Sequence, residues 1–84
     1  MKYSILIKKK AEKELLRLQR NEIIKIREAI NRLAENPRPH GSKKLTGSIN
    51  EYRLRVGDYR ILYTINDHII TIYIFKVAHR KEAY

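Results

Sequence analysis

The hydrophobic residues of the N-terminal half repeat with two different periods. Residues 2–7 place Tyr3, Ile5 and Ile7 on one side, which predicts a short β-strand. Apolar steps of three and four residues then predict two amphipathic helices. The apolar positions of these helices are Ala11, Leu15 and Leu18 in the first, and Ile23, Ile26, Ile30 and Leu33 in the second.

The second helix is expected over residues 22–35. Asn21 is a suitable N-cap for it, and Pro37 and Pro39 end it because proline cannot continue a helix. Since almost no loop separates the two helices, they are expected to form an antiparallel hairpin. Residues 40–47 are predicted to form a loop.

The C-terminal half alternates with period two, which predicts strands over residues 52–56, 59–65 and 70–75. Gly57 and Asp58 form a two-residue turn between the first two strands, and a second turn is centred on Asp67 and His68. Strand, helix, helix and a three-strand meander (β-α-α-β-β-β) predict an α+β fold. The helical hairpin packs on one face of a small, antiparallel-rich sheet, in a single domain of residues 1–84.

The turn at residues 57–58 also predicts the register of the hairpin. It places Arg55 opposite Arg60 and Arg53 opposite Leu62, on the face away from the apolar residues. Two arginines directly opposite each other repel, so this face is interpreted either as a solvated surface or as a site for an anion. The planar fork of arginine matches phosphate, which favours the second interpretation.

The last strand and its extension add aromatic and titratable groups to this arginine face. Tyr73, Phe75 and Val77 share its parity, and aromatic rings there could stack on nucleic-acid bases. His79 follows Val77 with the same parity if the strand continues, and a histidine can serve as acid or base near neutral pH. Arg80 and Tyr84 come next along the chain.

Composition strengthens the case for a polyanionic partner. The chain has 19 Lys and Arg against 9 Asp and Glu, a net charge of +10 on 84 residues. It has no cysteine, and its three histidines lack metal-ligand spacing, so we expect neither a metal nor another cofactor. The longest apolar run near the start, residues 5–7, is too short for a signal peptide or membrane span, so a soluble cytoplasmic protein is expected.

Three segments together resemble the RelE toxins of the RelE/ParE superfamily of toxin–antitoxin systems. They are Lys44-Leu45-Thr46-Gly47, Tyr52-Arg53-Leu54-Arg55-Val56-Gly57-Asp58-Tyr59-Arg60 and His79-Arg80-Lys81-Glu82-Ala83-Tyr84. The resemblance implies a metal-independent, ribosome-dependent endoribonuclease that cleaves mRNA in the ribosomal A site. It also implies a cognate antitoxin, for which an acidic segment is expected.

The resemblance implies residue roles as well. Arg60 and Arg80 would hold the scissile phosphate, and His79 or Tyr84 would transfer protons. The expected RNA-binding residues are Arg53, Arg55, Lys44, Tyr73 and Phe75. Two other functions stay open: a ParE-like toxin that inhibits DNA gyrase without cleaving nucleic acid, and a plain nucleic-acid-binding module.

Overall fold

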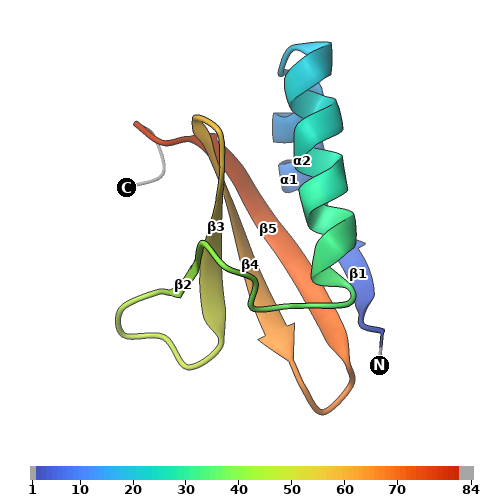
Figure 1. Ribbon diagram of the computed structural model, residues 1–84, viewed down its shortest axis with the longest axis vertical. Coiled ribbons are helices and arrows are strands. Elements are labelled where there is room, and N and C mark those ends of the chain that lie inside the picture. The colour runs from blue at the N-terminus through green and yellow to red at the C-terminus, as the bar shows by residue number, and fades with distance from the viewer. Residues whose placement is uncertain (1, 82–84) are drawn as a thin grey trace.

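The computed structural model describes residues 2–81, which form two helices and one five-stranded sheet (Figure 1). In chain order the elements are β1 (Ser4–Ile7), α1 (Lys9–Leu16), α2 (Arg20–Leu33), β2 (Ser42–Lys44), β3 (Glu51–Val56), β4 (Tyr59–Asn66) and β5 (Thr71–His79). The strands lie in the order β1-β5-β4-β3-β2, with β1 parallel to β5 and the other pairs antiparallel. Both helices lie on one side of the sheet, so the predicted α+β fold is confirmed.

The core lies between the helical hairpin and one face of the sheet. The predicted apolar stripes supply the helical side, where Leu15, Ile26 and Leu33 are completely buried. Ile61 and Ile74 are completely buried on the sheet side. Burial of each such side chain stabilises the fold by roughly 1.5–3 kcal/mol. Within residues 2–81, no helix has both the length and the apolar character needed to cross a membrane.

Several predicted bounds in the first half are wrong. The strand expected over residues 2–7 spans Ser4–Ile7, and the helix expected over residues 22–35 spans Arg20–Leu33. Residues 42–44, expected in a loop, form β2 and pair with β3, with Lys43 opposite Arg53. This strand is too short to show an alternating pattern, so only its pairing defines it. Helix α2 begins two residues early, because the backbone carbonyl of Gln19 accepts the N–H groups of Glu22 and Ile23 at 3.0 Å each. Asn21 therefore lies inside the first turn.

The second predicted turn is also longer than expected. The side chain of Asn66 accepts hydrogen bonds from the backbone N–H groups of His68 and Ile69, at 3.0 and 3.2 Å. These bonds favour a turn of four residues, 67–70, because the asparagine side chain takes the place of a backbone carbonyl. The strand β5 therefore begins at Thr71, which pairs with Asn66.

Strand β5 contains one more residue than the segment of β4 that it faces. Tyr63 pairs with Ile74 and Leu62 pairs with Lys76, so Phe75 is the extra residue of a β-bulge. The bulge shifts the alternation of the strand by one position. Val77 consequently faces the core, where only 4% of it is exposed. Its predicted place on the arginine face is wrong for this reason.

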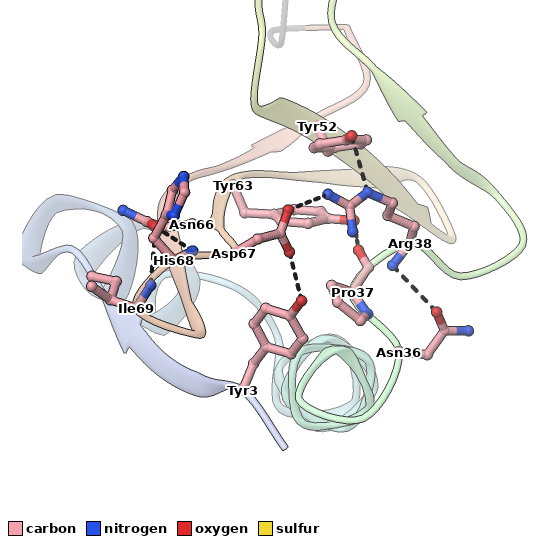
Figure 2. A network of polar contacts seen from close by, with 10 residues as sticks. All are labelled: Tyr3, Asn36, Pro37, Arg38, Tyr52, Tyr63, Asn66, Asp67, His68 and Ile69. Carbon is pink, nitrogen blue, oxygen red and sulfur yellow. Dashed lines mark hydrogen bonds and ion pairs between the residues drawn. The ribbon is translucent and has the colours of Figure 1, made fainter. Parts of the chain in front are cut away.

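Arg38, in the connection between α2 and β2, ties together three distant parts of the chain (Figure 2). Its Nη2 donates to the carboxylate of Asp67 at 3.0 Å, and its Nε donates to the hydroxyl of Tyr52 at 3.1 Å. The Tyr3 hydroxyl donates to the same carboxylate at 2.6 Å. This Arg38 cluster joins the residue that precedes β1, strand β3 and the β4–β5 turn at one end of the sheet.

The hydrogen bonds in this cluster shift the pKa of its members. Bonds from Tyr3 and then from Arg38 lower the pKa of Asp67, because they stabilise its charged form. The bond to Asp67 raises the pKa of Tyr3. Tyr63, next to the cluster, is fully buried and donates its hydroxyl to the Pro37 carbonyl at 2.8 Å. Burial raises the pKa of Tyr63 to about 12.

These shifts predict that Asp67→Asn changes the acid dependence of stability. The folded pKa of Asp67 lies below its unfolded value, so its contribution is present above the unfolded pKa of ~4 and is lost as pH falls through the folded pKa. Urea unfolding should show a stability deficit of the variant at pH 7 that shrinks as pH falls below ~4. Adding Tyr3→Phe to Asp67→Asn should cost less than Tyr3→Phe alone. If the stability deficit of Asp67→Asn stayed the same as pH falls below ~4, the lowered pKa of Asp67 would be contradicted.

Candidate functional site

Both helices lie on one side of the sheet (Figure 1), and the face away from them is here called the open face. Four neighbouring strands contribute cations to it. The register places on it Lys43 of β2, Arg53 and Arg55 of β3, Arg60 of β4 and Lys76 of β5. The segment that crosses from β3 to β4 is the tight turn at Gly57 and Asp58, and Gly57 has the positive φ, 60°, that such turns require. The local turn therefore sets the arginine register.

The predicted pairing of Arg55 with Arg60 is confirmed, as is that of Arg53 with Leu62. Arg55 is exposed, whereas Arg60 is half-buried and its Nε atom is covered. Arg60 is therefore the more constrained of the two side chains. Two positive charges held on directly opposite strand positions favour an anion placed between or above them.

Leu62 forms an apolar floor in the middle of the open face. Only 6% of it is exposed, although it lies on the side of the sheet opposite the main core. Its register partners are Arg53 and Lys76, so the aliphatic stems of long cationic side chains flank it. Such packing holds the stems in place while the charged ends stay at the surface.

Arg80 lies at the β3–β4 turn, at the end of the open face. Its backbone N–H donates to the carbonyl of Asp58 at 2.8 Å, and its Nη1 lies 3.9 Å from the Asp58 carboxylate. Ala78, two residues earlier, pairs with Arg60, so Arg80 continues on the same face beside Arg60. The register thus puts Arg80 next to the β3–β4 turn and on the same face as the Arg55–Arg60 pair, and its contacts are with Asp58.

His79 lies on the other side of the sheet, and its predicted position on the arginine face is wrong. It pairs with Tyr59, and the two rings meet edge to face with centroids 5.4 Å apart. The bulge at Phe75 is the physical cause, because it reverses the alternation of every later residue in β5. Tyr84, the other residue expected to transfer protons, lies outside the described residues.

The remaining predicted RNA-binding residues divide between the two faces. Tyr73 is on the open face and 40% exposed, and Phe75 at the bulge is half-buried with the same parity. Lys44 pairs with Tyr52, a residue of the helix-side face, so it does not share the face of the arginines.

The sequence alone did not predict that two further cations lie on the open face. Lys43 belongs to the unpredicted strand β2, and Lys76 takes its face from the bulge. A triplet such as Ser42-Lys43-Lys44 carries no alternation that could have revealed the first. The second had one local signal, because uninterrupted alternation would put the charged Lys76 on the core face with Ile72 and Ile74.

Acidic groups border the site. Glu51 shares the parity of Arg53 two residues away, and Glu14 of α1 lies 3.7 Å from the Nζ of Lys76. Within residues 2–81, the histidine and carboxylate side chains do not form a group of three that could hold a metal ion. The open face presents guanidinium groups and, farther along β5, the aromatic rings of Tyr73 and Phe75, which suit phosphate and bases.

Comparison with known proteins places the chain in a family. A sequence model described as the ParE toxin of the type II toxin–antitoxin system parDE matches residues 5–84. The chain belongs to the RelE/ParE family of type II toxins. A toxin candidate called RelE1, from Methanocaldococcus jannaschii, is 36% identical over 89 aligned positions that cover 100% of this chain and 97% of the relative.

Solved structures of RelE proteins share the fold of this toxin. The archaeal RelE–RelB complex from Pyrococcus horikoshii contains a chain with a TM-score of 0.86 and 32% identity, covering 99% of this chain and 100% of that one. The RelBE2 toxin–antitoxin complex from Mycobacterium tuberculosis gives a TM-score of 0.83 and 27% identity, covering 95% of this chain and 100% of that one. The resemblance inferred from three sequence segments is thereby confirmed.

The pairing of Arg55 with Arg60 predicts that Arg55→Gln stabilises the toxin. Removing one of two opposed charges should raise the free energy of unfolding by a few tenths of a kcal/mol at low salt. The gain should shrink as salt screens the repulsion. Lys44→Gln is the matched control, because it removes an exposed strand cation from the other face. Urea unfolding at two salt concentrations measures both, and a destabilised Arg55→Gln variant would contradict the prediction.

Proposed function

We propose that this type II toxin is an endoribonuclease that cleaves mRNA in the ribosomal A site and so inhibits translation in the cytoplasm. The observation that supports the proposal is the pairing of Arg55 with Arg60, with Arg80 following on the same face, which no helix within residues 2–81 covers. Two guanidinium groups at directly opposite strand positions repel each other, and an anionic substrate bound to both would relieve that repulsion.

The proposed chemistry is in-line attack of the 2′-oxygen on the adjacent phosphate. The bond from O2′ to phosphorus forms while the bond to O5′ breaks, which leaves a 2′,3′-cyclic phosphate and a 5′-hydroxyl. Negative charge accumulates on the phosphoryl oxygens in the transition state. Arg60 and Arg80 are proposed to stabilise that charge, and Arg53 and Arg55 to orient the RNA backbone. Tyr73 and Phe75 would stack on bases.

Two protons must move in this reaction, one from the 2′-hydroxyl and one to the 5′-oxygen. His79 lies on the helix-side face against Tyr59, away from the arginines. We therefore assign proton transfer to Tyr84 ahead of His79. A tyrosine has an ordinary pKa of ~10, which makes it a weak base unless cations nearby favour the phenolate.

A weak proton-transfer group explains why the ribosome would be required. The ribosome can hold mRNA in the geometry of in-line attack, and such positioning contributes up to ~7–11 kcal/mol to lowering a barrier. Free RNA lacks this preorganisation. The toxin would then supply the charged groups, and the ribosome would supply the substrate conformation.

A cognate antitoxin is the second proposed partner. The similar RelE chains from Pyrococcus horikoshii and Mycobacterium tuberculosis were solved in complex with antitoxins. The net charge of +10 on this toxin favours an antitoxin with an acidic segment.

Gyrase inhibition is the second candidate function, because the matching family model is that of ParE. A gyrase inhibitor needs no group that transfers protons. Cleavage of ribosome-bound mRNA therefore separates the two functions.

Arg60→Ala should abolish mRNA cleavage while the protein stays folded. Loss of one transition-state donor typically lowers the rate by ~10²–10³. Primer extension on mRNA bound to ribosomes measures the cleavage, and circular dichroism checks the fold. Lys44→Ala, on the other face, is the matched control and should retain cleavage. A folded Arg60→Ala variant that cleaves at the wild-type rate would remove Arg60 from the site.

End-group analysis tests the mechanism itself. Fragments should carry 5′-hydroxyl ends that polynucleotide kinase labels without prior phosphatase treatment, and cleavage of free RNA, though slow, should survive EDTA. Tyr84→Phe should slow cleavage more than His79→Ala. Fragments with 5′-phosphate ends would refute the mechanism, and inhibition of gyrase without mRNA cleavage would establish the ParE-like alternative.

A further inference from the structure

The β-bulge in β5 occurs where that strand loses its neighbour on one edge. Strand β1 pairs with β5 from Ser4–Thr71 to Ile7–Ile74. The N–H of Lys8 donates to the carbonyl of Ile74 at 2.8 Å, and the chain then turns away into α1. The half of β5 beyond Ile74 therefore continues without β1 beside it.

Glu14 of α1 takes over on this edge. One carboxylate oxygen of Glu14 accepts the backbone N–H of Val77 at 2.9 Å, and the other lies 3.7 Å from the Nζ of Lys76. Val77 is only 4% exposed, so water could not readily replace Glu14 as the acceptor of its N–H. A buried donor left without an acceptor is costly, and a bond to a carboxylate is stronger than one to a neutral oxygen.

This bond lies two residues after Phe75, the extra residue of the bulge. If β5 paired with β4 without Phe75 as an extra residue, the alternation would put Val77 and His79 on the open face and turn Lys76 and Arg80 away from it. The bulge is thus the feature that gives Arg80 its place beside Arg60.

We propose that Glu14 is a positioning residue: its carboxylate holds the bulge in β5 and thereby keeps Lys76 and Arg80 on the open face. This inference rests on the proposed function only in giving the open face RNA as its ligand. Glu14 does not need to touch RNA, since it acts through the backbone of β5.

Four variants separate the negative charge of the Glu14 carboxylate from its reach as a hydrogen-bond acceptor. Glu14→Gln keeps the acceptor and its reach but loses the charge, whereas Glu14→Asp keeps the charge but loses the reach. Glu14→Ala loses both. Glu12→Ala is the control, because it removes a carboxylate of the same helix that pairs with Arg27 instead of β5.

Amide hydrogen exchange of the full-length toxin gives the first measurement. Exchange at Val77 should become roughly ten- to a hundredfold faster, relative to Ile72, in Glu14→Ala and Glu14→Asp. Glu14→Gln should exchange at a rate between those of the wild type and Glu14→Ala, because a neutral oxygen accepts a weaker bond, and Glu12→Ala should exchange like the wild type. Unchanged exchange at Val77 in the first two variants would overturn the proposal.

The second measurement is the affinity for a short single-stranded RNA. The direction in which that affinity changes separates a simple charge effect from the loss of the bulge. Removal of a negative charge from a basic protein should by itself strengthen RNA binding. We expect Glu14→Ala to bind more weakly instead, with the slope of log affinity against log salt lowered by about 0.7 for each phosphate that the variant no longer neutralises. Glu14→Gln should bind at least as tightly as the wild type. Equal or tighter binding by Glu14→Ala would overturn the link between the bulge and the open face.

Failure of the proposed function would look different. A wild-type toxin that neither binds nor cleaves RNA would contradict that function. The exchange of Val77 and the nuclear Overhauser effects between Leu62 and Lys76 would still decide whether Glu14 holds the bulge.

Discussion

The pairing of β4 with β5 is the constraint on which the rest of the structure depends. Strand β4 is the central strand, and β5 lies between it and β1. Ile74 and Val77 both enter the core although three positions separate them, which a regular strand would place on opposite faces. The extra residue at Phe75 allows both side chains to reach the core. The free energy gained by burying Ile74 and Val77 offsets the interruption of the β4–β5 hydrogen-bond ladder at the bulge.

The pairing of β4 with β5 also puts the residues that stabilise the fold and the cations of the candidate site on opposite faces of the sheet. The core residues of β3, β4 and β5 lie against the helices, and the cations lie on the other face. The repulsion between Arg55 and Arg60 is small next to the burial of Ile61 and Val77, because opposed surface charges cost tenths of a kcal/mol and buried aliphatic side chains contribute several times more. A face can therefore collect charge while the fold stays intact.

Local rules determine the elements and registers that could be predicted from the sequence. The hairpin around Gly57 is such a case, because a two-residue turn allows one register, and that register produces the Arg55–Arg60 pair. The helical stripes are another, since Leu15, Ile26 and Leu33 reach the core as their spacing indicates. The family resemblance rests on segments that these rules already place.

The errors arise where an interaction between distant residues decides the outcome. His79 leaves the arginine face because of a bulge that Glu14, 63 residues away from Val77, helps to hold. A regular strand would place the charged Lys76 on the core face with Ile72 and Ile74, so residues 71–79 carry a sign of the irregularity, but the position of the extra residue is set by pairing with β4. The error also changes the chemistry, because a histidine packed against Tyr59 on the helix side is poorly placed to exchange protons with RNA held by Arg60. A single extra residue thus shifts the expected proton-transfer role from the side chain that has the more suitable ordinary pKa to a tyrosine.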